Sequence, residues 1–315
     1  MALVVNTNIA SMNAQRSLAA NTNDMKTAME RLSTGKAINS AADDAAGFAI
    51  AETMTAQIRG LSMAAKNSSD ALGLLKVIEN ATNDVTEMLQ RIRELAVQAN
   101  SGTNSTGDIA NLQKEAEALM DEIERVSQDT TYNNQAYLGA GADALTGGQV
   151  KIQVGYNDGD VIDVGVYNIH TGNLGHRSVD ATTGAVTFAS DTANESLTWD
   201  DTGVKKYLDI TLQQTVDATT GEVTAPGALQ VISDAITQVA SYKAEWGALQ
   251  NRLEYTVSNL MNVVEFTSAA RSRIQDADFA VEAANLAKAQ VLQQTGTAML
   301  AQANAAPQLA LQLLK

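Results

Sequence analysis

Histidines, paired carboxylates and glycine-rich loops are the residues of this 315-residue chain whose types and spacing could carry chemistry. The chain has two histidines, His170 and His176, in a turn-rich stretch, and their spacing matches no zinc-binding motif. We interpret both as surface histidines. The chain has no cysteine, which excludes disulfides, thiolate nucleophiles and thiolate metal ligands.

Two acidic pairs have the side chains of a catalytic carboxylate pair. Asp43-Asp44 comes just before a predicted helix, where carboxylates complement the helix dipole, and Asp200-Asp201 has the surroundings of a solvated turn. Neither pair has a basic or nucleophilic partner nearby in the sequence. Residues 139–144 share only the loose letters of a dinucleotide fingerprint and are interpreted as a flexible connection. We therefore expect no enzyme activity, no cofactor and no metal site.

The net charge of −15 argues against a nucleic-acid partner, because a protein that follows a phosphate backbone needs a basic surface. No window approaches about 18 continuous apolar residues, so no membrane insertion is expected. Residues 1–6 lack the basic and apolar regions of a secretory signal peptide.

Three helices are predicted in residues 1–138, at about Ile9–Leu32, Asp44–Asn100 and Asp108–Gln128. Gly35 suits the end of the first, and Asp108 is a possible N-cap of the third. The second helix has apolar residues at steps of three and four, with one discontinuity near Ile78, which is typical of a coiled coil. These residues are Ile58, Leu61, Ala65, Leu72, Leu75, Ile78, Val85, Leu89, Ile92 and Ala96.

The region of about 228–306 is predicted to be helical again and begins after Pro226-Gly227. Its heptad pattern is interrupted in residue type only by Lys243 and Gln250. Residues 228–270 would make a rod of roughly 65 Å, which needs partner helices along its length. The heptad positions are Leu229, Ile232, Ile236, Val239, Lys243, Trp246, Gln250, Leu253, Val257, Leu260 and Val264.

Strands and turns are predicted between about 140 and 224. Residues 152–156 and 162–166 alternate apolar and other side chains around the turn sequence Asn157-Asp158-Gly159-Asp160, which predicts a hairpin. Residues 179–187 recur as residues 216–224. This repeat indicates either two equivalent strand–turn–strand corners or chance similarity in a segment rich in Thr, Gly and Val. The fold class is therefore mainly α with a β-rich middle. Its two ends form a long antiparallel coiled-coil or helical-bundle rod, which carries a β-hairpin and a small outer β insert.

Three stretches of the chain carry recognisable motifs. They are the amino end (Asn6-Thr7-Asn8 and residues 32–36 and 38–47), residues 89–99, and the carboxyl end (residues 272–278, 296–304 and 311–314). These stretches resemble bacterial flagellins, the subunits of the flagellar filament. Ala37 and Phe48 depart from the family's usual residues, and residues 171–224 carry no recognisable motif. The resemblance covers about residues 1–169 and 228–315.

The resemblance implies three parts: residues 1–43 with 271–315 as an inner coiled coil of the terminal helices, residues 44–170 with 225–270 as a rod-like helical core, and residues 171–224 as a surface-exposed insert. It implies a structural protein that polymerises with itself into an extracellular filament for swimming. Its implied partners are the flagellar type III export apparatus, a chaperone at the carboxyl end, and the filament cap and hook-junction proteins. We further expect residues 1–40 and 275–315 to be disordered in the monomer, because segments this poor in large apolar groups bury too little surface.

The resemblance also implies a surface recognised by host Toll-like receptor 5 or by neighbouring subunits, with Arg91 as a bidentate donor and Leu95 as an apolar anchor. The residues concerned are Gln90, Arg91, Arg93, Glu94, Leu95, Gln98 and Glu115. A second set is expected to pack between helices on assembly, where methionine adapts to irregular contacts. These residues are Met12, Met25, Met29, Leu32, Leu286, Met299 and Leu300.

Three other classes of protein share some of these features. A hook–filament junction protein would share the terminal pairing, but residues 90–98 and the Leu-Leu end weigh against it. An enzyme carried on the insert is disfavoured, because the insert lacks a metal-binding His-Glu motif. A cytosolic coiled-coil signalling protein would have ends already folded in the monomer.

Overall fold

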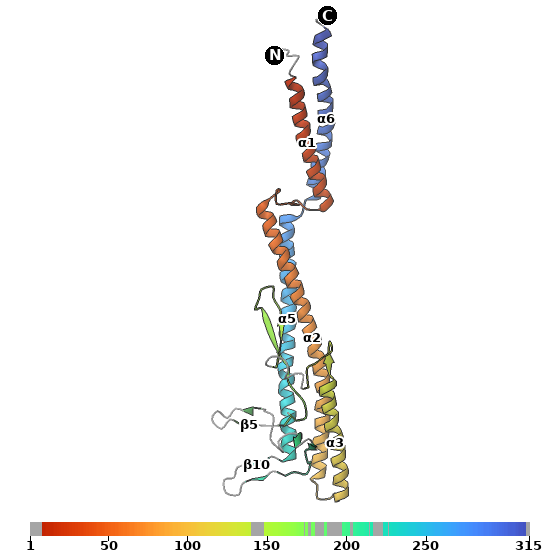
Figure 1. Cartoon of the computed structure of the whole chain (residues 1–315), viewed down its shortest axis with the longest axis vertical. Coiled ribbons are helices and arrows are strands. Elements are labelled where there is room, and N and C mark those ends of the chain that lie inside the picture. The colour runs from red at the N-terminus through yellow and green to blue at the C-terminus, as the bar shows by residue number, and fades with distance from the viewer. Residues whose placement is uncertain are drawn as a thin grey trace. The chain divides into compact units, whose positions relative to one another are not determined.

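The computed structural model describes residues 8–139, 148–172, 174–175, 178–179, 186–187, 197–201, 204–213, 215–216, 223–225 and 227–312. Within these residues the helices are α1 (Ile9–Thr34), α2 (Ala45–Ala99), α3 (Thr106–Asp129), α5 (Ala228–Gln275) and α6 (Phe279–Gln312). The strands form antiparallel pairs in the middle of the chain (Figure 1). These pairs are β1 (Thr131–Tyr132) with β2 (Gln135–Ala136), β3 (Gln149–Gln153) with β4 (Val161–Gly165), β5 (Ser178–Val179) with β6 (Val186–Thr187), β7 (Thr198–Asp201) with β8 (Val204–Tyr207), and β9 (Thr215–Val216) with β10 (Val223–Ala225). The expected mainly helical fold with a β-rich middle is confirmed.

The chain divides into two compact units, and the boundary between them falls inside α2 and α5. The first unit comprises Met1–Gly60 with Asn262–Lys315, and the second comprises Leu61–Met261. None of the helices in the described part of the chain is long and apolar enough to cross a lipid bilayer.

In the first unit, α1 and α6 lie side by side (Figure 1). The side chain of Asn8 caps α1 by accepting a hydrogen bond from Ser11 N at 3.1 Å. Gly35 ends the helix in the left-handed region, with φ +71°, and its N–H donates to Arg31 O at 2.9 Å. The predicted stop at Gly35 is therefore confirmed. Asp278 begins α6, because its Oδ1 accepts from Ala280 N at 2.9 Å.

Two short connectors in the first unit are tied to each other. They lead from α1 to α2 and from α5 to α6. Lys36 and Asp276 form an antiparallel bridge, Ala37 N donates to Gln275 O at 2.7 Å, and Ala277 N donates to Gly35 O at 3.0 Å. The predicted continuous helical region of 228–306 is therefore two helices, separated by a paired strand-like step.

Asp44 caps α2, as the acidic pair at 43–44 predicted. Its Oδ1 accepts from Ala46 N and Gly47 N, each at 3.0 Å. Asp43 instead holds the connector, since its Oδ2 accepts from Ser40 N at 2.9 Å and from Asn39 N at 3.1 Å. These backbone hydrogen bonds from Ser40 and Asn39 lower the pKa of Asp43.

In the second unit, α2, α3 and α5 share one hydrophobic core. Every third or fourth residue of α5 is buried or half-buried, which confirms the predicted heptad. Its two polar positions have polar partners on α2, since Lys243 Nζ donates to Asn83 Oδ1 at 2.5 Å and Gln250 Nε2 donates to Glu79 Oε2 at 2.9 Å. The largest fully buried side chains of the helices are Leu75, Ile78, Leu89, Ile92, Leu95, Met120, Ile123 and Trp246.

The gap expected in the apolar heptad of α2 near Ile78 is a core position that holds a polar residue. Thr82 is fully buried between Ile78 and Val85, and its hydroxyl donates to Ile78 O at 2.6 Å. Since the hydroxyl finds its acceptor within the helix, threonine can occupy a core position there. The heptad of α2 therefore continues through this region.

The start of α3 differs from the prediction. Ser105 is the N-cap, and Asp108 is the third helical residue, with which Ser105 forms a reciprocal capping box. Asp200 and Asp201, interpreted as a solvated turn, lie instead in strand β7 opposite Lys205 and Val204 of β8.

The predicted hairpin is confirmed as β3 and β4, with Ile152 opposite Ile162. Gly159 in its turn has φ +91°. In the repeat, Val179 pairs with Val186 and Val216 pairs with Val223. Each copy therefore contributes residues to one antiparallel strand pair, at equivalent positions. The hairpin of β1 and β2 was not predicted; its Asn133 and Asn134 both have positive φ, as a two-residue turn of type I′ requires.

Candidate functional site

The described part of the chain contains no cluster of three or more His, Asp or Glu side chains that could hold a metal ion. His170 Nε2 contacts Glu124 Oε1 at 2.5 Å, and its Nδ1 accepts from Gly172 N at 3.0 Å. Glu124 also accepts from the hydroxyl of Thr171 at 2.8 Å. His170 therefore ties the segment after β4 to α3 and is only partly exposed. His176 and residues 140–144 of the glycine-rich stretch lie outside the described residues.

The seam between α1 and α6 follows a heptad in which small and polar residues alternate with single leucine or methionine side chains. On α1 its buried or half-buried members are Ser11, Ala14, Leu18, Asn21, Met25, Ala28 and Leu32. On α6 they are Glu282, Leu286, Ala289, Gln293, Gly296, Leu300 and Ala303. A Cβ atom at Gly296 would lie 3.3 Å from Leu18 Cδ1, so the glycine allows close approach of the two helices. Such a seam buries little apolar area for its length.

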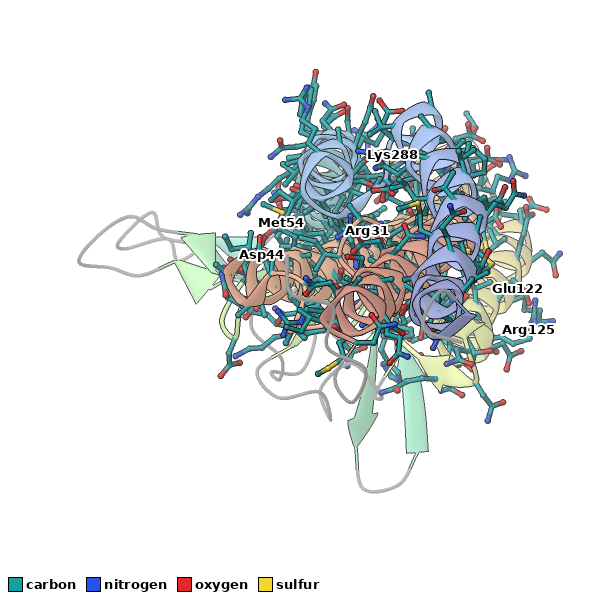
Figure 2. All side chains as sticks on the ribbon, turned by 90° about the horizontal axis from the view of Figure 1, so that it is seen from above. Arg31, Asp44, Met54, Glu122, Arg125 and Lys288 are labelled. Carbon is teal, nitrogen blue, oxygen red and sulfur yellow. The ribbon has the colours of Figure 1, made fainter. Side chains whose placement is uncertain are left out.

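Side-chain hydrogen bonds cross this seam from end to end. Asn8 Nδ2 donates to Ala303 O at 2.7 Å and Ser11 Oγ donates to Asn304 Oδ1 at 2.8 Å. Asn21 Nδ2 donates to Ala289 O at 2.8 Å, and Arg31 Nη1 forms an ion pair with Glu282 Oε1 at 3.1 Å. Because residue numbers on α6 fall as those on α1 rise, the helices are antiparallel. Figure 2 labels Arg31 and Lys288 on this pair.

Large apolar side chains of the terminal helices point to solvent instead of into the seam. Met12 is 61% exposed, Met29 50% and Met299 64%. Ile9, Phe279, Val281, Val291 and Leu292 are exposed as well. The predicted assembly residues therefore divide in two: Met25, Leu32, Leu286 and Leu300 lie in the seam, whereas Met12, Met29 and Met299 are free to contact another molecule.

A polar surface runs along α2 and α3 in the second unit. Gln90, Arg91, Arg93, Glu94 and Gln98 are exposed on α2, and Glu115 is exposed on α3, so the structure brings these predicted residues together on one surface. We call these six residues the rod surface.

Arg91 is held between two carboxylates of the rod surface. Its Nε and Nη2 donate to Glu115 Oε1 at 3.0 and 2.8 Å, and its Nη1 donates to Glu94 Oε2 at 3.0 Å. The hydrogen bond with Glu115 is the main cause that raises the pKa of Arg91. Arg93 Nε donates to Ser233 Oγ on α5 at 3.4 Å. The guanidinium of Arg91 is thus oriented within the chain.

Leu95 does not belong to this surface. It is fully buried in the core, because a step of three from the core residue Ile92 places it on the inner face of α2. Its expected role as the apolar anchor for a partner is therefore wrong, since a partner cannot reach it in this structure. The apolar side chain that the sequence reasoning missed is Val97, which is 52% exposed. Together with Gln90, Arg93, Glu94 and Gln98, it lines an open depression of about 400 Å³.

A second arginine with two carboxylates lies on α3 alone. Arg125 pairs with Glu122 Oε1 at 2.5 Å and with Asp129 Oδ2 at 3.0 Å. Figure 2 shows Glu122 and Arg125 at the outer surface of this helix. Hydrogen bonds from Arg125 lower the pKa of Glu122. Arg125 therefore matches Arg91 in charge and exposure without linking two helices.

Two family models match the chain: the bacterial flagellin N-terminal helical region over residues 5–142, and the bacterial flagellin C-terminal helical region over residues 229–314. The chain is 39% identical over 318 residues to the flagellin of Bacillus subtilis (strain 168), with 99% of each chain covered. It is 38% identical over 313 residues to the flagellin of Halalkalibacterium halodurans, covering 99% of this chain and 100% of that protein. Among solved structures, the crystal structure of Bacillus cereus flagellin has a TM-score of 0.42 and 25% identity, covering 62% of this chain and 88% of that chain.

Proposed function

This chain belongs to the bacterial flagellin family, whose members are structural subunits of the extracellular flagellar filament, and on that premise we propose how it polymerises. The contacts between subunits are made by the apolar side chains that α1 and α6 leave exposed. These contacts repeat from one subunit to the next as open heterologous interfaces, which generate a helical polymer.

The exposure of Met12, Met29 and Met299 carries this proposal. Full burial of a methionine side chain stabilises a contact by ~1.5–3 kcal/mol, so the three together could hold an interface if a second molecule covers them. The seam of the pair cannot receive these side chains, because its positions are already filled. A second copy of this chain offers the complementary apolar surface.

We further propose that α1 and α6 are ordered by assembly. Fixing each backbone residue costs ~1–2 kcal/mol, and a seam with few large apolar side chains, none of them fully buried, offsets only part of that cost in a single chain. Covering the exposed apolar residues supplies the remainder. Residues 1–40 and 275–315 are then disordered in the monomer, which prevents polymerisation before the chain reaches the filament tip.

The same disorder suits the route that we propose for the chain. It is exported unfolded by the flagellar type III apparatus, after a cytoplasmic chaperone has held its carboxyl end. It then meets the hook-junction proteins and the filament cap. In the filament, residues 1–43 with 271–315 form the inner layer, residues 44–170 with 225–270 form the rod, and residues 171–224 face solvent.

For the rod surface we propose two successive partners. In the filament it contacts the rod of a neighbouring subunit, and in monomers it is recognised by Toll-like receptor 5 of an animal host. Arg91, with its orientation set by Glu94 and Glu115, supports this proposal, because a preorganised guanidinium loses little conformational freedom on binding. Val97 takes the role of the apolar contact that Leu95 cannot fill.

Electron microscopy of the purified chain, after seeding or salting out, tests the polymerisation. A version without residues 1–40 and 276–315 is the matched sample. We expect filaments from the full chain and none from the truncated one. Limited proteolysis of the monomer should remove both ends while α2, α3 and α5 remain protected. A full chain that stays monomeric with protected ends would contradict the proposal.

A further inference from the structure

The apolar side chains of the α1–α6 seam cannot select one register by themselves. On α1, Leu18 and Leu32 are two heptads apart, and on α6, Leu286 and Leu300 have the same separation. If one helix slides along the other by whole heptads, the leucine and alanine side chains of the seam meet neighbours similar to those they had before. Packing of this kind gives several pairings of nearly equal free energy.

Besides the Asn8 and Ser11 hydrogen bonds at the far end of the seam, two buried polar side chains contact the opposite helix. Asn21 is 9% exposed, and its side chain reaches the backbone carbonyl of Ala289. Glu282 is 8% exposed; its Oε1 pairs with Arg31 and its Oε2 accepts from Asn285 Nδ2 at 3.4 Å. These groups lose their hydration on pairing, so an unpaired carboxylate at this position is costly.

Sliding the helices by one heptad breaks the charge pair in either direction. In one direction Glu282 meets Asp24 instead of Arg31, which brings two negative charges together. In the other direction Glu282 passes beyond the end of α1 at Thr34 and has no residue of that helix opposite it. Only the described register satisfies Glu282.

We propose that Asn21 and the Arg31–Glu282 pair specify both the register and the partner helix of the terminal pair, and that they do so at a cost in stability. This inference rests on the proposed function for its effect in the filament, whereas the register itself is a property of each chain. A buried asparagine in a coiled-coil seam has this combination of effects. The result is that α1 pairs with α6 in one register, and the apolar outer faces stay free for neighbours.

Engineered cysteines test the register directly, because the chain has none of its own. Leu18→Cys with Gly296→Cys reports the described register, since these two positions are in contact across the seam. Leu18→Cys with Ala289→Cys reports a slip of one heptad. Filaments of each are oxidised, and denaturing gels separate disulfides within one chain from those between chains.

In the otherwise unaltered seam, we expect the first cysteine pair to form a disulfide within the chain and the second to form almost none. Asn21→Leu combined with Arg31→Leu and Glu282→Leu should raise slipped disulfides by about tenfold or more, while helix content does not fall. Asn23→Leu and Arg16→Leu are matched controls at exposed positions of α1 and should leave the pattern unchanged.

The charge swap Arg31→Glu with Glu282→Arg, in the presence of Asn21, should restore the disulfide of the described register. The inference is overturned if the apolar variant still forms only that disulfide, or if the swap behaves like the apolar variant. If the unaltered chain forms no filaments, the proposed function fails. In that sample a disulfide between positions 18 and 296 still supports the register, and mixed disulfides overturn it.

Discussion

Arg91 on α2 and Glu115 on α3 meet through a single carboxylate oxygen that accepts from two guanidinium nitrogens, at 2.8 and 3.0 Å. The side chains are 50% and 46% exposed, so solvent screens the pair and it contributes little to stability. The pair instead fixes the orientation of the Arg91 guanidinium, because Glu94 also accepts a hydrogen bond from its third nitrogen, Nη1. A partner of the rod surface therefore meets Arg91 in one orientation.

Replacing Arg91 should separate recognition from folding. We expect Arg91→Ala to weaken activation of Toll-like receptor 5 by monomers tenfold or more, a loss of at least ~1.4 kcal/mol, with a thermal midpoint within a few degrees of the parent. A reporter-cell titration and a thermal scan measure the two effects. Arg125→Ala is the control, since Arg125 is equally charged and exposed but lies away from the rod surface. Equal activation by both variants would remove Arg91 from the recognition surface.

The exposed methionine of α6 should control polymerisation through its apolar character. We expect Met299→Gln to raise the critical concentration for filament formation by about tenfold or more, because a buried methionine contact of ~1.5–3 kcal/mol is lost. Met299→Leu keeps an apolar side chain of similar volume and should polymerise like the parent. Sedimentation of polymer at several subunit concentrations gives the values. Normal polymerisation of the glutamine variant would show that no neighbour covers this side chain.

Trp246 should anchor the core of the second unit. It is 1% exposed, and its indole N–H donates to Gly165 O at 2.8 Å, which joins α5 to strand β4. We expect Trp246→Ala to lower the free energy of unfolding by ~3–5 kcal/mol. Trp246→Phe should lose about 1–3 kcal/mol, since a carbonyl loses its donor while most of the packing remains. Urea denaturation followed by circular dichroism compares them, and a near-neutral alanine variant would contradict this role.

The capping box of α3 should make stability depend on acid pH. Hydrogen bonds from the hydroxyl and the backbone N–H of Ser105 lower the pKa of Asp108 in the folded chain. Because the folded pKa lies below the unfolded value of about 3.9, the contribution is present above that value and is lost as pH falls through the folded pKa.

Asp108→Asn should therefore be less stable than the parent at pH 7, and the difference should vanish as pH falls well below about 4. Urea denaturation at the two pH values measures this, with Asp84→Asn as a control for an exposed aspartate on α2. A difference that persists unchanged at acid pH would mean that the ionised carboxylate is not what stabilises the cap.

The helices were predictable because apolar residues recur at steps of three and four over long stretches. Two features escaped that reasoning for physical reasons. Thr82 lies in the core although it is polar, since its hydroxyl is satisfied by its own helix. Ser105 caps α3 through an aspartate, whereas the usual capping-box partner is glutamate or glutamine, so the signal was weak.

The candidate surfaces were predictable in composition but less so in orientation. Exposure of Gln90, Arg91 and Gln98 follows from their places between core positions of α2. Leu95 was misplaced, because a motif of adjacent residues does not state which of them faces inward. Likewise, Met299 and Leu300 are neighbours in the sequence, yet one faces solvent and the other faces the seam. Only the partner helix decides which heptad phase is buried.

The bridge between Lys36 and Asp276 has a mechanical consequence. Both connectors of the first unit run antiparallel and share backbone hydrogen bonds, so neither can turn about its own bonds without breaking contact with the other. A single strand at this step would act as a swivel. Two joined strands act as a stiff coupling, and a torque applied to α2 and α5 within this unit is passed to α1 and α6 with little free rotation.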